Sequence, residues 1–297
     1  MRSLRQVPVQ ENFINVGGVK LFVRSEGNGK TLLFLHGGPG SSHDYFVPYV
    51  AKLARKRNLI LYDQRGSGRS DTLPTSEYSI DNYVNEVRRL IRALNLSKVD
   101  ILGHSWGGFL AQRYALKFQD TIDHLILCCT TSNTITLNSE WKKNWKSIPQ
   151  KKRQPLESYL KLGGHKRGQP YPGEYVGMVK SLQRGKRKPP VDTTQFTDMI
   201  FAGFSWPVYG HLMGGGTFEY NIDGELEGFD TRDELPKITV PTLIMAGKYD
   251  GFKLDEVSEM KRLIPNSRMI IFEKSGHWPF LEENSRFTSE TERFLSS

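Results

Sequence analysis

Residues 103–107 (Gly-His-Ser-Trp-Gly) constrain the fold of this chain more than any other stretch. They follow residues 99–102, which are apolar and β-branched like a strand, and they precede residues 108–116, whose apolar side chains have helical spacing. Glycines two before and two after a serine allow a tight turn between strand and helix without Cβ clashes, and this turn exposes the hydroxyl. The pattern predicts that Ser105 is a nucleophile; the alternative is a chance match in a glycine-rich loop.

Short apolar runs alternate with helical patterns along most of the chain. Residues 13–16 and 19–24 alternate apolar and polar side chains across Gly17-Gly18, which predicts a β-hairpin. Continuous apolar runs predict strands that are covered on both faces. Strands that alternate with helices are typical of an α/β fold with a mostly parallel sheet flanked by helices. We expect strands over 31–35, 59–62, 99–102, 122–129, 242–246 and 269–272, and helices over 79–94, 108–116, 254–263 and 279–294.

The alternation stops between residues 131 and 235. This interval lacks a clear strand pattern, carries aromatic residues such as Trp141 and Trp206, and contains interruptions rich in proline and glycine. We therefore expect residues 131–235 to form an inserted, mainly helical cap. Residues 1–130 and 236–297 would then form the core of the protein.

The composition is that of an ordinary globular protein. The chain has 297 residues, of which 37% are hydrophobic and 25% are charged. No apolar run approaches the ~20 residues of a membrane-spanning helix, and no apolar segment follows the basic residues at the N-terminus. The two cysteines, Cys128 and Cys129, are adjacent on an apolar run, which favours a reducing compartment over a disulfide or a zinc site. We expect a cytoplasmic protein without a membrane anchor or a bound metal.

The positive charge is concentrated in one segment. The formal net charge is +9, but residues 141–190 contain 14 Lys or Arg against Glu157 and Glu174, so the remainder of the chain is slightly acidic. No zinc-finger spacing, aromatic RNA-binding run or helix-turn-helix pattern accompanies this segment. We interpret it as a solvated basic face and expect no nucleic-acid partner.

A serine needs a base to become a nucleophile near neutral pH, and the base needs a third group to orient it. Reactive groups of an open parallel sheet collect at the carboxyl ends of its strands. Asp250 follows the predicted strand 242–246, and His277 follows the predicted strand 269–272. We therefore predict a catalytic triad of Ser105, Asp250 and His277.

Other histidines and aspartates fit these roles less well. His36 and His104 lie inside tight glycine turns, where a histidine more often braces the loop. The remaining histidines do not follow a predicted strand, and the remaining candidate aspartates fit capping or solvated positions. These weaker candidates are His43, His124, His165, His211, Asp63, Asp100, Asp123 and Asp255.

A tetrahedral intermediate needs hydrogen-bond donors directed at its oxyanion. In this topology one donor is the backbone N–H of the residue after the nucleophile, which is Trp106. The other donor comes from the glycine-rich loop 36–40, where Gly38 is the best candidate. Pro39 has no N–H and cannot donate.

Several motifs occur together in this chain. They are residues 36–40 (His-Gly-Gly-Pro-Gly), 63–70 (Asp-Gln-Arg-Gly-Ser-Gly-Arg-Ser), 103–108 and the placements of Asp250 and His277. In combination they resemble the proline iminopeptidase family of α/β hydrolases, most closely its tricorn-interacting aminopeptidase branch. The resemblance covers nearly the whole chain, although it is loose in the cap. It implies an α/β-hydrolase fold, no cofactor, and cleavage of an N-terminal residue, often proline, from short peptides.

An aminopeptidase must also hold a cationic amino group beside the nucleophile, which requires a carboxylate. The resemblance implies such a glutamate near the end of the cap, and residues 218–224 followed by Phe229-Asp230 match that part of the branch. Glu219 is therefore the candidate for binding the substrate amine. A solvated cap glutamate is the alternative, and Glu225 and Glu227 are the fallbacks.

Gly251 departs from the pattern of the branch, which has a second glutamate directly after the triad aspartate. This departure favours substrates without a free amine. We therefore keep three hypotheses: a serine aminopeptidase that releases N-terminal proline or small apolar residues through an acyl-enzyme, an esterase, amidase or lactonase of small molecules that uses the same triad, and a catalytically silent basic binding module. The presence of Ser105, Asp250 and His277 argues against the third.

Overall fold

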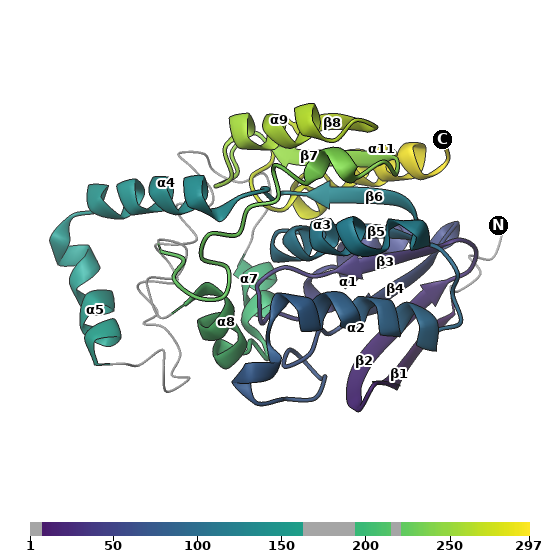
Figure 1. The fold of residues 1–297 in the computed structure, drawn as a ribbon, viewed down its shortest axis with the longest axis horizontal. Coiled ribbons are helices and arrows are strands. Elements are labelled where there is room, and N and C mark those ends of the chain that lie inside the picture. Colours follow the sequence, from purple (N-terminus) through teal and green to yellow (C-terminus); the bar gives the residue numbers. More distant parts are fainter. Residues whose placement is uncertain (1–7, 163–193, 215–220) are drawn as a thin grey trace.

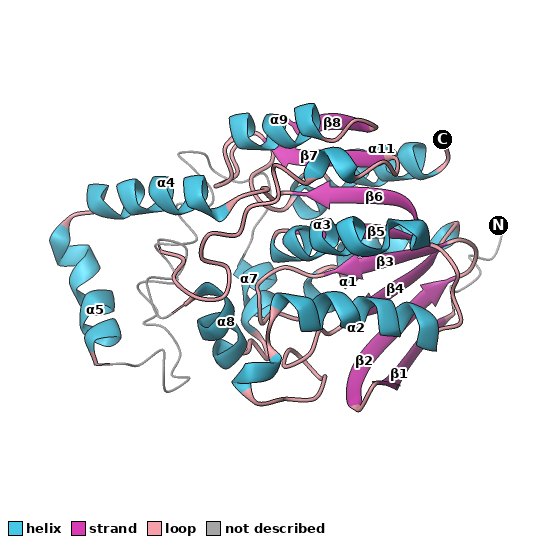
Figure 2. Ribbon diagram, in the orientation of Figure 1, coloured by secondary structure: helices cyan, strands magenta, loops and turns pink. Residues whose placement is uncertain are grey.

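The computed structural model describes residues 8–162, 194–214 and 221–297, and it contains an eight-stranded sheet (Figures 1 and 2). The order of the strands across the sheet is β1-β2-β4-β3-β5-β6-β7-β8. The strands are β1 (Val9–Val16), β2 (Val19–Gly27), β3 (Thr31–Leu35), β4 (Asn58–Tyr62), β5 (Val99–His104), β6 (Ile122–Cys128), β7 (Thr242–Gly247) and β8 (Ser267–Phe272).

The sheet is mostly parallel, as predicted. β1 pairs with β2 in the expected hairpin, β2 pairs antiparallel with β4, and every pair from β4 to β8 is parallel. Strands β3, β5, β7 and β8 therefore end at the same edge of the sheet. Loops that carry chemically useful side chains follow each of these ends, so this edge is where a site is expected.

Helices cover both faces of the sheet (Figures 1 and 2). Helices α2, α3 and α9 contribute to a hydrophobic core on one face, and α10 and α11 contribute to a second core on the other. Their bounds are α1 (Val47–Val50), α2 (Ile80–Ala93), α3 (Trp106–Phe118), α9 (Leu254–Leu263), α10 (Pro279–Glu282) and α11 (Asn284–Leu295).

The alternation of side chains along β3 shows why the sheet is covered on both sides. Leu33 and Leu35 belong to the core beneath α2 and α3, whereas Leu32 and Phe34 belong to the core on the opposite face. Successive side chains of a strand point to opposite faces, so a continuous apolar run needs two covers. This confirms the interpretation of residues 31–35 as a strand covered on both faces.

The predicted helix over 279–294 is divided in two. Glu283 leaves the helical conformation, with φ −129° and ψ 47°, between α10 and α11. Its carboxylate accepts hydrogen bonds from the Lys274 N–H at 2.8 Å and from the Ser275 hydroxyl at 2.8 Å. A contact with the preceding loop therefore accompanies the break.

The segment between β6 and β7 is helical where the structure describes it. It contains α4 (Thr134–Ser147), α5 (Gln150–Lys161), α7 (Thr194–Phe201) and α8 (Trp206–Met213). Residues 163–193, which hold part of the basic segment, lie outside the described residues. The division into a core and a cap with boundaries near 131 and 235 stays a prediction.

Both cysteines are buried and unpaired: Cys128 ends β6 and Cys129 follows it. Among the described helices, none combines the length and the apolar character that crossing a membrane requires.

Candidate active site

Ser105 lies on a sharp turn between β5 and α3, as the motif predicts. Its φ of 56° and ψ of −121° are unusual for a residue other than glycine. A Cβ on Gly103 would overlap the carbonyl of Gly107, and a Cβ on Gly107 would overlap the carbonyl of Leu35. Both glycines are therefore required by close backbone packing, and the turn presents Ser105 where a helix begins.

Asp250 and His277 are brought together from loops that are 27 residues apart in the sequence. The Nδ1 atom of His277 is 2.9 Å from Oδ1 of Asp250, and their side chains are only 10% and 3% exposed. The loops that carry them pack closely, because a Cβ on Gly247 would overlap the carbonyl of Gly276. A buried carboxylate at this distance orients the imidazole and stabilises its protonated form.

The loop that carries His277 is held by the acidic residues that follow it. Glu282 accepts hydrogen bonds from the N–H groups of Gly276, at 2.7 Å, and of Trp278, at 3.3 Å. Burial raises the pKa of Glu282 above its usual value, although these two N–H donors act in the opposite direction. The backbone on both sides of His277 is thereby attached to the start of α10.

His277 also lies beside the end of the strand that leads to Ser105. The rings of His277 and His104 are 4.8 Å apart, and His104 is the last residue of β5, immediately before Ser105. On the other side of the turn, a Cβ built on Gly37 would lie 3.0 Å from Cβ of Ser105. Ser105, His277 and the 36–40 loop therefore meet at the carboxyl edge of the sheet.

His36 orients the backbone of this loop. Its Nε2 accepts a hydrogen bond from the Gln64 N–H at 3.1 Å, so the proton of the neutral ring is on Nδ1, which lies 2.8 Å from the carbonyl oxygen of Gly37. Burial lowers the pKa of His36 from 6.5 to about 4, which keeps the ring neutral. Since C=O and N–H point in opposite directions in a trans peptide, the N–H of Gly38 is directed away from His36.

Gln64 connects this loop to the residue after Ser105. Its Nε2 donates to the His36 carbonyl at 2.9 Å, and its Oε1 accepts from the indole Nε1–H of Trp106 at 2.7 Å. The side chains of all three residues are buried. Gln64 was not among the residues singled out in the sequence, although it belongs to the 63–70 motif.

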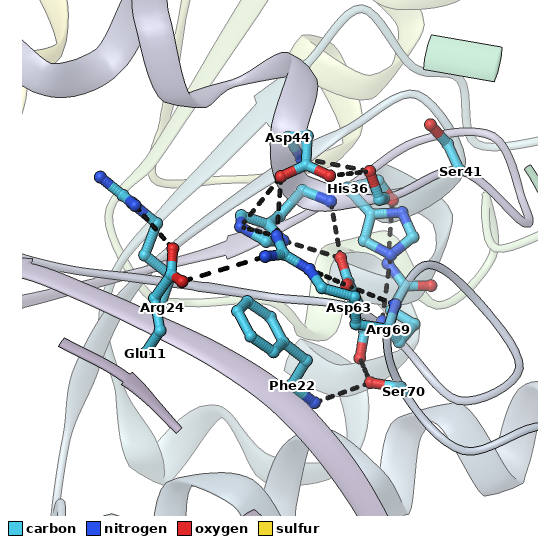
Figure 3. Close-up of polar contacts among 12 residues, drawn as sticks. Glu11, Phe22, Arg24, His36, Ser41, Asp44, Asp63, Arg69 and Ser70 are labelled. Carbon is cyan, nitrogen blue, oxygen red and sulfur yellow. Dashed lines mark hydrogen bonds and ion pairs between the residues drawn. The ribbon is translucent and has the colours of Figure 1, made fainter. Parts of the chain in front are cut away.

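Asp63 is buried and contacts several groups of the neighbouring loops (Figure 3). The expectation that it is a capping or solvated carboxylate was therefore wrong. Its oxygens accept from the His43 N–H at 2.9 Å and from the Arg69 N–H at 2.8 Å, and Oδ1 is 2.7 Å from Nδ1 of His43. Burial by itself raises the pKa of Asp63, but the hydrogen bonds from His43 and Arg69 outweigh it and hold the pKa below its usual value.

The Arg69 side chain extends the same cluster (Figure 3). Its guanidinium lies 3.6 Å from the centroid of the Phe22 ring and donates to Asp44 at 2.8 Å. The cluster joins the loop after β3 to the loop after β4. The 63–70 motif therefore supports the loops of the site. Its third charged residue, Arg65, lies outside this cluster and pairs with the buried Glu86 of α2 at 2.9 Å.

Glu219, the residue predicted to bind the substrate amine, lies outside the described residues. The fallback Glu225 is exposed, and its Oε1 lies 3.4 Å from the Ile80 N–H at the start of α2. Glu227 is also exposed. Glu225 is thus engaged with the end of a helix.

Cys129, Asp250 and His277 are the one group of metal-ligating side chains found close together among the described residues, with ligand atoms within 4.8 Å of one another. The hydrogen bond between His277 and Asp250 occupies one ligand atom of each. We derive no metal-dependent step from this group, and the absence of a cofactor stays a prediction.

Comparisons with known proteins agree with this geometry. The family model for the alpha/beta hydrolase fold matches residues 30–284. A proline iminopeptidase of Saccharolobus solfataricus is 32% identical, over 97% of this chain and 93% of that protein. The chain belongs to the proline iminopeptidase family of α/β hydrolases. A second relative from this family, in Heyndrickxia coagulans, is 30% identical over 97% of this chain and 99% of its own.

A solved member of the family has the same architecture. The crystal structure of proline iminopeptidase from Mycobacterium smegmatis is similar to this chain with a TM-score of 0.77 and 25% identity, over 97% of this chain and 98% of the other. The similarity to the family thus extends over almost the full length. The fold predicted from the sequence motifs is confirmed.

Proposed function

We propose that this protein is a serine aminopeptidase that releases N-terminal proline or small apolar residues from short peptides. The observation that carries the proposal is the 2.9 Å contact between His277 Nδ1 and Asp250 Oδ1 at the same sheet edge as the strained turn of Ser105. Membership in the proline iminopeptidase family supports the choice of substrate. The two unpaired cysteines support the expected location in the cytoplasm.

In the proposed reaction, Ser105 Oγ attacks the carbonyl carbon of the N-terminal residue while His277 removes the hydroxyl proton. Asp250 keeps the His277 proton on Nδ1, so that Nε2 is the base. The N–H groups of Gly38 and Trp106 donate to the oxyanion, an interaction worth about 3 kcal/mol per donor in comparable sites. His277 then protonates the leaving amine of the shortened peptide.

Water completes the cycle. It attacks the acyl-enzyme ester while His277 accepts its proton. As the second tetrahedral intermediate collapses, the protonated His277 returns this proton to Ser105 Oγ. The released product is the free N-terminal amino acid. No atom of a cofactor enters this sequence.

Recognition of the substrate amine is the part of the proposal that distinguishes a peptidase from an esterase. We assign this role to Glu219, on its position in the 218–224 run that resembles the family. Gly251 leaves one carboxylate fewer beside the site than in the tricorn-interacting branch. The alternative function, hydrolysis of small esters, amides or lactones, is favoured by this one feature.

One comparison of substrates tests the proposal. Proline-linked and alanine-linked chromogenic amides, with free and with acetylated amino groups, are compared with simple chromogenic esters. We expect turnover of the free-amine amides, its loss on acetylation, and loss of all activity in Ser105→Ala. Glu219→Gln should raise KM for free-amine substrates much more than for esters. Equal turnover of free and acetylated substrates would instead support the esterase or amidase alternative.

A further inference from the structure

A chain of buried hydrogen bonds joins the loops of the site through groups that the proposed reaction does not use. The Gly37 N–H lies 2.6 Å from Tyr45 Oη, which lies 2.9 Å from Nδ1 of His104. Nε2 of His104 in turn lies 2.9 Å from the carbonyl oxygen of His277. Tyr45 belongs to none of the sequence motifs described above, and no pattern in the sequence indicated a role for it.

Burial keeps the His104 ring neutral, because it lowers the pKa of His104 well below 6.5. For a neutral ring, only one arrangement of protons satisfies every link of this chain. The His277 carbonyl can only accept, so the proton of the ring is on Nε2 and Nδ1 is an acceptor. Tyr45 Oη then donates to Nδ1 and accepts from the Gly37 amide, which can only donate.

The surroundings of the two side chains maintain this arrangement. Tyr45 and His104 are both 2% exposed. Burial, and after it the charge of His277, lower the pKa of His104 well below 6.5, and burial raises the pKa of Tyr45. The Phe280 ring packs on both side chains, with its centroid 5.8 Å from the Tyr45 ring and 5.1 Å from the His104 ring. Phe46, which directly precedes α1, also contacts both rings. The rings are thus held in place on several sides.

Each link of the chain meets a part of the proposed machinery. Gly37 precedes Gly38, the proposed oxyanion donor, and its peptide is fixed on the amide side by Tyr45 and on the carbonyl side by His36. His104 is covalently joined to Ser105. The last link ends on the backbone of His277 itself. The nucleophile, the base and the oxyanion donor are therefore connected through two side chains.

We propose that Tyr45 and His104 are positioning residues that hold the 36–40 loop, Ser105 and His277 at their working separation. Neither side chain contacts the reacting atoms in this role. The inference rests on the proposed function only in assuming acyl transfer at Ser105. It does not depend on whether the substrate carries a free amino group.

Two substitutions at His104 separate the two links that this side chain makes. The amide of glutamine reaches the position of Nε2, so His104→Gln keeps a donor for the His277 carbonyl and loses the acceptor for Tyr45. The amide of asparagine reaches the position of Nδ1, so His104→Asn keeps the acceptor and loses the donor. Tyr45→Phe removes the same link as His104→Gln and leaves the buried Gly37 N–H unpaired, which costs about 1–3 kcal/mol.

We expect Tyr45→Phe and His104→Gln each to lower kcat by about tenfold to a hundredfold while KM changes by less than about threefold, because geometry in the transition state is lost and binding is retained. Since Tyr45→Phe already breaks the link that His104→Gln breaks, the double variant should be no slower than the slower single variant. Tyr45→Phe combined with His104→Asn should be slower than either single variant, since the link to the His277 carbonyl is then broken as well.

The measurements are kcat on a proline-linked amide, kcat on a simple chromogenic ester, and the rate of labelling by a fluorophosphonate. Each is divided by the concentration of active sites, which is taken from the amount of fluorophosphonate bound when labelling is complete. Thermal unfolding is measured for every variant. Matched controls are Tyr114→Phe and His124→Gln, which alter a buried hydroxyl bonded to Thr121 and a buried imidazole bonded to Asp100 away from the site. Both controls should retain the wild-type kcat.

The outcomes distinguish this proposal from the proposed function. Wild-type kcat per active site in Tyr45→Phe and His104→Gln would overturn the positioning role, even if the peptidase activity is present. Additive effects of these two substitutions would also overturn it. A wild-type protein that cleaves the ester but not the free-amine amide would overturn the aminopeptidase function alone, because the ester still reports on the chain. A wild-type protein that fluorophosphonate does not label would overturn both.

Discussion

Gly251 is the residue at which the chain differs most clearly from the family branch that it resembles. It is exposed, it follows Asp250 directly, and a Cβ built on it would meet no atom within 4 Å. Its φ lies outside the left-handed region that only glycine tolerates easily. The position can therefore accept a side chain without rearrangement of the loop, and the loss of a carboxylate here is a difference in recognition rather than a requirement of the fold.

We therefore predict that Gly251→Glu raises kcat/KM for free-amine substrates by about threefold to tenfold, since a partly exposed ion pair contributes ~1 kcal/mol. Steady-state kinetics with matched free and acetylated amides would measure the effect. Gly251→Gln is the control, because it has nearly the same size and no charge. An equal gain with Gln, or an equal gain on acetylated substrates, would contradict a role for charge.

At the scale of elements, the turn between β5 and α3 shows a conflict between local preference and packing. Gly107 is inside the first turn of α3, where alanine is normally favoured over glycine by about 1 kcal/mol. The Leu35 carbonyl of the adjacent strand occupies the space that its Cβ would need. Because that neighbour is backbone in the centre of the sheet, it cannot move aside easily.

Gly107→Ala should consequently lower the free energy of unfolding by more than about 2 kcal/mol, despite the better helix propensity. Gly210→Ala in α8 is the matched control: nothing lies within 4 Å of its Cβ position, so we expect no loss and a gain of up to about 1 kcal/mol. Urea denaturation of the two variants compares them. Equal stability of both variants would mean that the sheet adapts to the methyl group.

At the scale of the whole molecule, the site sits on buried histidines that must be neutral. The pKa of His36 is lowered to about 4, and the pKa of His104 is lowered well below 6.5, in both cases chiefly by burial. The unfolded chain therefore binds more protons than the folded protein between pH 6.5 and about 4. Stability conferred by the neutral rings is fully present above pH 6.5 and is lost as the pH falls through this window.

We predict that each ring contributes up to about 1.4 kcal/mol of lost stability per pH unit in this window. Buried carboxyl groups with raised pKa values, such as Glu282 and Glu256, contribute with the opposite sign below neutral pH. The informative quantity is therefore the difference between the wild type and His36→Gln in denaturation from pH 7 to pH 4.5. The two curves should converge as the pH falls, and parallel curves would refute the assignment.

Much of the architecture could be predicted from local sequence patterns. Continuous apolar runs correspond to β3, β4 and β6, and the helical spacing over 254–263 corresponds to α9. These patterns are reliable because burial on both faces of a strand, or on one stripe of a helix, constrains each residue type separately. The break at Glu283 escaped prediction, since it accompanies contacts with a loop eight and nine residues earlier.

The sequence by itself determined the fold family, the strained turn of Ser105 and the strand-end positions of Asp250 and His277, because each depends on residues that are neighbours in the chain. Only the tertiary structure decided how Gln64 joins Trp106 to His36 and how Tyr45 and His104 join Gly37 to His277. These links connect residues up to 173 positions apart. A hydrogen bond between distant segments leaves no periodic trace in the sequence, since its geometry exists only once the sheet has brought the strand ends together.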